Sequence, residues 1–284
     1  MESPAWQARA SGEMAREQRS TRGIDYQDVP RPVSALADEY PADHVDPRHC
    51  HARAQLLYAS AGIMCVITDA ASFVVPPQRA LWIPPKAFHE VHCRGHVSVR
   101  TLYIDAAALP NLPSDCRVIE VSSLMRELII EATILPVEYD EDGRDGRVMD
   151  LILDEITHMP AVPLHVPMPS HPNLERTCRS ILANPSRSDT LDALARTASM
   201  GRRTFTRHFK RETGMTFAAW RQHVRLMEAL SRLAIGHRVT SVAFDVGYNS
   251  SSAFTAMFKR TFGVPPTEYF SAGGTAAVSA GEDG

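Results

Sequence analysis

The sequence FTRHFKRETG, residues 205–214, returns as FTAMFKRTFG at residues 254–263. The Phe-Thr pair, the Phe-Lys-Arg triplet and the closing glycine recur in register, 49 residues apart. In a helix the two phenylalanines of each copy lie one turn apart on an inner face, opposite a polar face. This pattern is typical of the second helix of a helix-turn-helix, which enters the major groove of DNA. The repeat predicts two adjacent major-groove contacts.

Charge divides the chain in the same sense. Of the 30 Lys and Arg and 33 Asp and Glu residues, positions 170–284 hold 15 basic and 9 acidic residues, and positions 1–169 hold 15 and 24. The C-terminal part therefore carries a net charge of +6 and the N-terminal part −9. A basic C-terminal part suits a phosphate-rich partner.

The five cysteines are scattered and form no CxxC pair. This favours reduced thiols over a disulfide framework. The first thirty residues mix both charges and contain no apolar run, so we expect no signal peptide and no membrane span. We expect a soluble, cytoplasmic protein.

The N-terminal half is predicted to be rich in β-strands. From about His49, short apolar runs are separated by Gly62, Pro76-Pro77, Pro84-Pro85 and Gly95, as in an antiparallel sandwich or barrel. Helical spacing then places Leu124, Leu128, Ile129 and Leu135 on one face, and Val148, Leu151, Ile152 and Ile156 on another. These two helices either complete the N-terminal core or expose a stripe for dimerisation.

The C-terminal half is predicted to be helical throughout. We expect a helix N-capped at Asp189, a recognition helix over residues 202–212 stopped by Gly214, and a long helix over residues 216–234. The long helix spans roughly 28 Å, close to one turn of B-DNA at about 34 Å. Thr240 is expected to cap the next helix, and Asn249 or Ser250 to cap the second recognition helix. Ala253, Phe254, Met257 and Phe258 form its inner face.

The strings TFTRHFKRETGMTFAAWRQHVRL, ALSRLAIG and VTSVAFDVGYNSSSAFTAMFKRTFGVPPTEY resemble the AraC/XylS family of transcription regulators over about residues 171–270. The resemblance implies a DNA-binding domain of seven helices with two helix-turn-helix units. It also implies which side chains face DNA: Arg202, Arg203, Thr206 and Arg207 in the first reading helix, and Ser250, Ser251, Ser252, Thr255 and Ala256 at the second. The helical pattern agrees, because these positions lie opposite the phenylalanines.

Arginine can hold a guanine edge with two hydrogen bonds, which suits Arg203 or Arg207. Arg211, Lys259 and Arg260 suit phosphate contacts, which position a protein without reading bases. The first turn departs from the Ala-Gly-Met-Ser of relatives and reads Ala198-Ser199-Met200-Gly201. Glycine is a weaker cap than serine, so we expect the first unit to dock on DNA more loosely than the second.

A second resemblance lies in HCHARAQLLYASAG, residues 49–62, which is similar to the first cupin motif, while IPPKAFHEVHC matches the second motif in part. Alternate residues of a strand share a face, so His49 and His51 point together. His89 on a facing strand and Gln55 would complete a polar set that can bind a divalent cation such as Zn, Fe, Mn or Ni. A metal-free pocket for a small molecule and histidines satisfied within the core are the alternatives. His92, three residues after His89, is expected on the opposite face of the strand.

Together these features predict a multidomain α and β protein: a cupin-like β-barrel with flanking helices, then an all-α domain with two helix-turn-helix motifs. The expected division is a poorly ordered segment at residues 1–30, a sensor and dimerisation domain at 31–159, and a proline-rich linker at 160–172. The DNA-binding domain follows at 173–270, and residues 271–284 form a disordered tail.

The predicted function is a transcription regulator, activator or repressor, controlled by a small-molecule or metal effector. Its expected partners are promoter DNA, a second copy of the chain and RNA polymerase, with no membrane. The alternatives are a cupin metalloenzyme of dioxygenase or isomerase type and an architectural DNA-binding protein. No GxxxxGK loop, nucleophile elbow or HExxH string is present, so the common enzyme classes are excluded.

Overall fold

The structure is a computed structural model, and it describes residues 19–109 and 113–269. The chain forms two compact units. The first comprises Met1–Met64 and Pro77–Val162, and the second comprises Cys65–Pro76 and Pro163–Gly284. The boundary therefore differs from a simple division of the chain at the proline-rich segment.

The described residues contain strands β1 (Val33–Tyr40), β2 (Val45–His49), β3 (Ala54–Thr68), β4 (Ala71–Val75), β5 (Arg79–Ile83), β6 (His89–Ile104), β7 (Arg117–Glu120), β8 (Ala161–Val162) and β9 (His165–Pro167). The main sheet has the order β1-β6-β3-β5-β7-β8, and β2 pairs with β6. Strand β4 pairs with β3 and β9. Strands β1, β2 and β7 lie where the sequence pattern predicted no strand.

Two strands are longer than the sequence pattern predicted. Gly62 lies inside β3 and Gly95 inside β6, with φ of 78° and 70°, so each glycine bends a continuous strand where we expected a break. A Cβ atom at Gly62 would lie 2.3 Å from the carbonyl oxygen of His96. Glycine at this position therefore meets both a backbone and a packing requirement.

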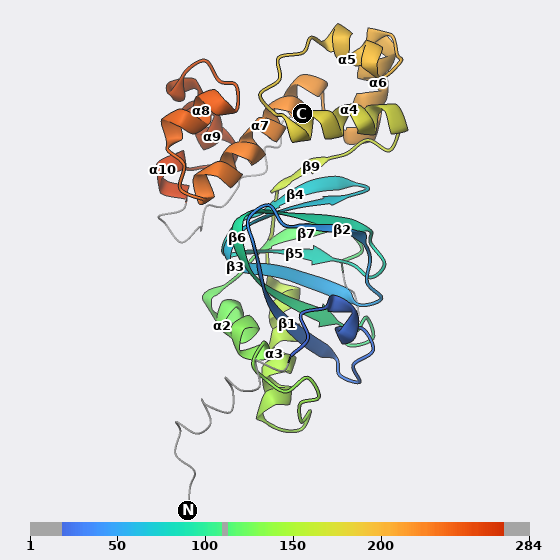
Figure 1. The fold of residues 1–284 in the computed structure, drawn as a ribbon, viewed down its shortest axis with the longest axis vertical. Helices are drawn as coiled ribbons and strands as arrows, with labels where there is room; N and C mark the ends of the chain where they lie inside the picture. The colour runs from blue at the N-terminus through green and yellow to red at the C-terminus, as the bar shows by residue number, and fades with distance from the viewer. Residues whose placement is uncertain (1–18, 110–112, 270–284) are drawn as a thin grey trace, which may run out of the picture. The chain divides into compact units, whose positions relative to one another are not determined.

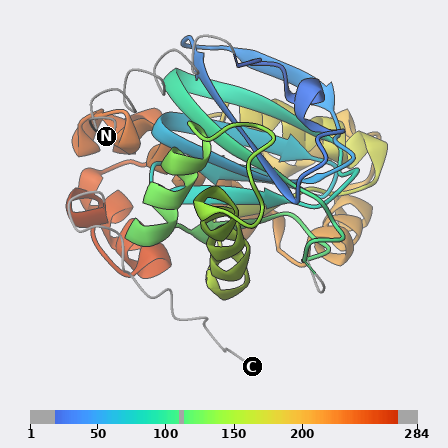
Figure 2. The same ribbon diagram turned by 90° about the horizontal axis from the view of Figure 1, so that it is seen from below.

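Helices α2 (Ser123–Ala132) and α3 (Arg144–His158) complete the core of the first unit. Figures 1 and 2 show the two helices next to each other on one side of the first unit's strands. Their buried side chains are Met125, Leu128, Ile129 and Ala132 from α2, and Met149, Ile152 and Ile156 from α3. Leu124 and Leu151, which the sequence spacing placed on the same apolar faces, are 49% and 38% exposed.

The segment before β1 corrects the expectation of disorder where the structure describes it. Gly23–Tyr26 form a 3-10 helix, η1, and Tyr26 is buried. The side chain of Arg53 donates hydrogen bonds to the carbonyl oxygens of Gln27, Val29 and Arg31. These bonds fix the chain between η1 and β1. Residues 1–18 and the expected tail at 271–284 lie outside the described residues.

The second unit contains α4 (Pro172–Ala183), α5 (Leu191–Thr197), α6 (Arg202–Thr213), α7 (Phe217–Ala234), α8 (Val239–Asp245), α9 (Ser251–Phe262) and α10 (Pro266–Tyr269). Helices α5 and α6 form one helix-turn-helix, and α8 and α9 form the other. Gly214 and Gly263 end the two recognition helices in the left-handed conformation, with φ of 72° and 80°. No helix among residues 19–109 and 113–269 is long and apolar enough to cross a membrane.

Most helix ends of the second unit were predicted correctly. Thr216 caps α7 and Ser250 caps α9 through their side chains. Two expected caps were wrong: Thr190, one residue after Asp189, caps α5, and α8 begins after Arg238, before Thr240. The hydroxyl of Thr190 accepts from the amide of Ala193.

The inner faces of both recognition helices are aromatic. Phe205 and Phe209 are fully buried in α6, as are Phe254 and Phe258 in α9. Ala253, which we expected on the inner face of α9, is exposed, and Phe262 is buried instead. The polar faces of α6 and α9 are thereby turned away from the core.

The proline-rich segment 160–172 contains the short strands β8 and β9. Both lie at sheet edges, where a residue without an N–H group is tolerated. Within the second unit β9 pairs with β4, and the indole N–H of Trp220 on α7 donates to the carbonyl oxygen of Pro167 at 2.7 Å. This segment is therefore attached to the long helix by specific contacts.

Candidate DNA interface and histidine site

The first recognition helix, α6, presents a basic face. Arg202, Arg203 and Arg207 are exposed, opposite the buried phenylalanines. Arg202 pairs with Asp192 of α5 at 3.3 Å, whereas Arg203 and Arg207 form no ion pair within the described residues. The hydroxyl of Thr206 reaches the carbonyl oxygens of Arg202 and Arg203, both at 3.1 Å. Two guanidinium groups are therefore free to bind a ligand.

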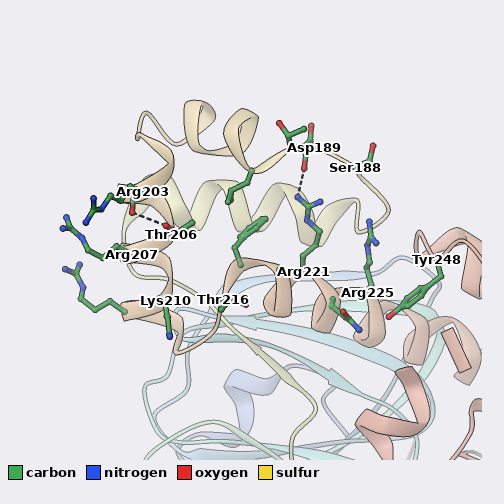
Figure 3. Close-up of a pocket in the computed structure, with 16 residues that line it drawn as sticks. Ser188, Asp189, Arg203, Thr206, Arg207, Lys210, Thr216, Arg221, Arg225 and Tyr248 are labelled. Atoms are coloured by element: carbon green, nitrogen blue, oxygen red, sulfur yellow. Dashed lines mark hydrogen bonds between the residues drawn. The ribbon is translucent and has the colours of Figure 1, made fainter. Parts of the chain in front are cut away.

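This face continues into a groove with a volume of about 1260 Å³ along α6 and the first half of α7 (Figure 3). Figure 3 shows the long side chains of α6 on one side of this groove and those of α7 on the other. Its cationic lining residues are Arg203, Arg207, Lys210, Arg211, Arg221 and Arg225, against the single carboxylate of Asp189. The sequence pattern singled out neither Lys210 on α6 nor Arg221 and Arg225 on α7, and it predicted α7 only as the helix that joins the two halves.

The second recognition helix, α9, presents small polar side chains. Ser250 acts as the N-cap, since its hydroxyl accepts from the amide of Ala253 at 3.2 Å. Ser251 and Thr255 are half-buried and Ser252 is exposed. Lys259 and Arg260 lie exposed in the last turn, as Arg211 does in the last turn of α6, where it pairs with Glu212 at 3.2 Å.

The turn of the first helix-turn-helix is strained compared with that of the second. Ser199 has a φ of 56°, in the left-handed region that favours glycine. Gly201 is the N-cap of α6 and supplies no side-chain hydrogen bond. The glycine of this turn thus occupies the position where serine would cap the helix, and the serine occupies the left-handed position.

In the first unit, His49, His51 and His89 come together. One ring nitrogen from each lies within 4.8 Å of the others, and this is the only such group found among the described residues. The Nε2 atoms of His49 and His51 are 3.2 Å apart. His49 is the last residue of β2 and pairs with His89 at the start of β6, while His51 lies beyond the strand end. The three side chains that the sequence grouped are therefore neighbours, although His51 reaches the site from a loop.

Backbone hydrogen bonds orient two of the rings. The Nδ1–H of His49 donates to the carbonyl oxygen of Pro47 at 2.7 Å, and that of His89 donates to Ala87 at 2.9 Å. In the neutral form each ring then carries its lone pair on Nε2. Nε2 of His89 is buried and has no hydrogen-bond partner in the described structure. His89 is therefore only partly satisfied by the residues that the structure describes.

Burial favours the neutral imidazole at His51 and His89. It lowers the pKa of His51 to about 3, with further lowering by the neighbouring His49 and His89. Burial also lowers the pKa of His89, against the opposing effect of its hydrogen bond to Ala87. Neutral imidazole is the form that binds metal ions.

Gln55 and Asp46 line the same cavity as the three imidazoles and carry oxygen atoms. Gln55 is buried and its amide donates to the hydroxyl of Thr101 at 3.1 Å, while its Oε1 has no partner in the described structure. A carboxylate oxygen of Asp46 lies 3.6 Å from Nε2 of His49. Asp46 was missed in the sequence, since nothing in its local pattern distinguishes it from other surface acids.

These groups line a cavity of about 250 Å³. Leu36, Leu57, Val91 and Val99 provide its apolar walls, and Tyr103 adds a phenol. Burial raises the pKa of Tyr103, so its hydroxyl remains protonated. Gly23 and Ile24 of η1 also contribute to the lining. The segment that was expected to be disordered is therefore part of the site.

Two helix-turn-helix units with a cationic groove, together with a barrel cavity in a separate unit, define a DNA-binding protein with a ligand-binding domain. A model of the AraC-like ligand binding domain matches residues 31–159, and a helix-turn-helix domain model matches residues 194–272. The chain belongs to the AraC family of helix-turn-helix transcriptional regulators. It is a DNA-binding transcriptional regulator with a cupin-like N-terminal domain.

Individual relatives extend this comparison. The chain is 31% identical over 223 residues to the HTH-type transcriptional regulator NimR of Escherichia coli (strain K12), covering 78% of this chain and 81% of the relative. It is 30% identical over 103 residues to the regulator RipA of Corynebacterium glutamicum, covering 36% and 31%. The solved DNA-binding domain of AdpA in complex with a target DNA is 30% identical, covers 34% of this chain and 88% of that one, and has a TM-score of 0.33.

Proposed function

We propose that the protein reads promoter DNA with α6 and α9 in two major-groove segments, and that the histidine site in residues 31–159 controls this reading. Residues 173–270 would form the DNA-reading domain. Arg203 and Arg207 are exposed and unpaired within the described structure, so they suit guanine edges. Ser251, Ser252 and Thr255 of α9 suit short-range hydrogen bonds to bases. Arg202 and Thr206 support the first set, and Ser250 is the cap that orients the second.

The remaining cations suit the phosphates. Arg211, Lys259 and Arg260 lie in the last turns of the recognition helices, and Lys210 lines the groove beside α6. Each phosphate that such a side chain neutralises releases counterions, so binding should weaken steeply as salt rises. This part of the interface would supply affinity, and the exposed faces of α6 and α9 would supply specificity.

The observation that carries the proposal for the histidine site is the unpartnered Nε2 of His89, in a cluster with His49 and His51. A tetrahedral zinc ion with Zn–N bonds of about 2.0–2.1 Å holds its ligand nitrogens about 3.3 Å apart. The 3.2 Å separation of the His49 and His51 nitrogens fits this requirement. The oriented rings of His49 and His89 provide the outer hydrogen bonds that metal-bound histidines use. We propose that the three histidines hold a divalent cation such as Zn, Fe, Mn or Ni.

Gln55 replaces the glutamate of the cupin pattern, and Asp46 partly restores the lost negative charge. Its carboxylate is close to His49 but approaches from β2 rather than β3. The cavity beside the histidines leaves room for a small molecule, so a metal and an organic effector are compatible in one site. We propose that the site senses its ligand and does not catalyse a reaction.

Control of DNA binding requires different ligand affinities in two states of the protein. Strand β3 supports such a link, because Gln55 and Leu57 near its start line the cavity and its last residues belong to the second unit. There Sγ of Cys65 lies 3.9 Å from the hydroxyl of Ser231 on α7. A change in the strand at the cavity would therefore act on the unit that reads DNA.

We further propose a homodimer as the working form, with RNA polymerase as a partner at the promoter and the cytoplasm as its compartment. Two copies would double the number of recognition helices and lengthen the operator. These assignments rest on the DNA-reading role.

The experiment is a metal analysis of protein purified without a histidine tag. The parent is compared with a His49→Ala/His51→Ala variant and with His96→Ala, an exposed histidine of β6 outside the cavity. The proposal predicts bound metal in the parent and in the His96 variant, and none in the double variant. Equal metal content in all three proteins, or none in any, would refute a metal site and leave an organic effector as the ligand of this cavity.

A further inference from the structure

One side chain of α7, Arg225, connects the segment that precedes the first helix-turn-helix to the turn of the second. Its Nε–H donates to the carbonyl oxygen of Pro185 at 3.2 Å, and its Nη2 to that of Arg187 at 3.4 Å. Both residues lie in the segment between α4 and α5, directly before the first helix-turn-helix. Its Nη1 donates to the carbonyl oxygen of Gly247 at 3.1 Å, in the turn between α8 and α9 of the second helix-turn-helix.

The contact at Gly247 leaves little room for a side chain. Gly247 has a φ of 87°, and a Cβ atom there would lie 3.0 Å from Cζ and Nη2 of Arg225. The turn of the second helix-turn-helix therefore lies directly against the guanidinium group of Arg225. Figure 3 shows Arg225 between the segment that carries Asp189 and Tyr248, the residue that follows Gly247.

Neighbouring arginines of α7 make more local contacts. Arg221 donates to the carbonyl oxygen of Asp189 at 2.6 Å and stacks on the ring of Phe217. It therefore contacts the segment before the first helix-turn-helix but, within the described residues, makes no such bond to the second. Arg232 pairs with Glu228 on its own helix and Asp245 on α8. Among these three arginines, Arg225 alone donates to carbonyl oxygens both in the segment before the first helix-turn-helix and in the turn of the second.

We propose that Arg225 is a positioning residue that sets the separation of α6 and α9 on DNA. The planar guanidinium offers five donors in a rigid fork, which three carbonyl oxygens from two loops can fix at once. A lysine keeps the charge but cannot hold the same three directions. Replacing the Arg225 side chain removes the link between the turn of the second helix-turn-helix and the segment before the first. Helix α7 itself remains intact. The inference rests on the proposal that α6 and α9 both read DNA.

The test uses full-length protein and selection from a random-sequence duplex library. The parent is compared with Arg225→Lys, Arg225→Gln and the control Arg221→Lys, and thermal unfolding verifies that each protein folds. The parent should enrich two half-sites at one fixed spacing. The Arg225 variants should enrich the same half-site bases at several spacings, and should bind the parent's paired site about tenfold more weakly. Arg221→Lys should retain the parent's spacing.

The outcomes separate the two proposals. A parent that enriches no paired motif contradicts the DNA-reading proposal itself. A parent with a fixed spacing that folded Arg225→Lys and Arg225→Gln also keep overturns only the role of Arg225. Loss of half-site recognition as well as spacing in the folded variants would likewise overturn it, since the effect would then be a general one. If Arg225→Gln does not fold, Arg225→Lys alone decides between these results.

Discussion

His49 and His89 are directly opposite each other across the antiparallel pair β2–β6, with ring centroids 4.3 Å apart. Strand pairing thus brings together two imidazoles that are far apart in the sequence. His51 completes the group from the loop after β2, with its ring centroid 4.7 Å from that of His49. The backbone of the barrel therefore creates the site, and the bonds to Pro47 and Ala87 set the ring orientations.

Gln55→Glu should increase metal affinity by about 10–100-fold, the range that ligand and outer-shell changes produce. The new carboxylate would stand where an oxygen already lacks a partner. In metal-free protein the same substitution buries a charge and should lower the free energy of unfolding at neutral pH. Metal titration and urea unfolding with and without metal measure both effects. A variant with unchanged affinity would show that Gln55 does not face the ion.

The turn before α6 offers a stability test. Ser199→Gly should stabilise the protein by about 0.5 kcal/mol, because serine is held at positive φ. Gly201→Ser should add about 0.5 kcal/mol through a side-chain cap, and no atom lies within 4 Å of the added Cβ. Gly214→Ser, at the other end of the same helix, should instead cost about 1 kcal/mol because of its φ of 72°. Chemical denaturation measures all three, and equal effects at Gly201 and Gly214 would contradict this account.

Arg207→Ala and Arg211→Ala should weaken DNA binding in different ways. Loss of a base contact at Arg207 should cost about 1–3 kcal/mol and relax specificity at one position of the operator. Loss of a phosphate contact at Arg211 should weaken binding to all sequences and reduce the salt slope by about one. Anisotropy titrations on specific and random duplexes across a salt series distinguish them. Identical salt slopes and specificities for the two variants would contradict the assignment of Arg207 to a base and Arg211 to a phosphate.

Titration of His223 should make the stability of the protein depend on pH. Its ring donates to the carbonyl oxygen of His165 at 2.9 Å, and burial lowers its pKa below the usual 6.5. The folded protein then binds fewer protons than the unfolded chain just below pH 6.5, so this contribution to stability is present above that value and lost as the pH falls. His223→Gln keeps a donor that does not titrate. Between about pH 7.5 and about pH 5.5, the parent should lose more stability than this variant in urea unfolding, whereas parallel losses would contradict the assignment.

The DNA-reading half was largely predictable from sequence because its signals are local. The phenylalanine spacing defines the buried faces of α6 and α9, and Gly214, Thr216 and Ser250 define helix ends through their own conformations and hydrogen bonds. The cap at Asp189 failed because the adjacent Thr190 competes for the same role. Arg225 was missed because its partners lie in loops that only the folded chain brings near α7.

The barrel was less predictable because its contacts are long-range. Strand β1 carries Asp38 and Glu39 directly before its last residue, Tyr40, and its burial is continuous over residues 33–36 instead of alternating. Gly62 and Gly95 suggested strand ends, since sequence cannot distinguish a bend inside a strand from a turn. The His49–His51 pair and His89 were recognised by motif, yet Asp46 and η1 entered the site only through tertiary packing.

The central claim is that occupancy of the histidine site changes DNA binding. Its most direct test is the affinity of tag-free protein for the duplex it enriches, measured by anisotropy with added zinc and with a chelator, beside a His89→Ala variant. The account predicts a change of at least about fivefold between the two conditions, the lower end of typical coupling between sites, and no response in the variant. Equal affinity of the parent with zinc and with chelator would contradict control by metal at this site.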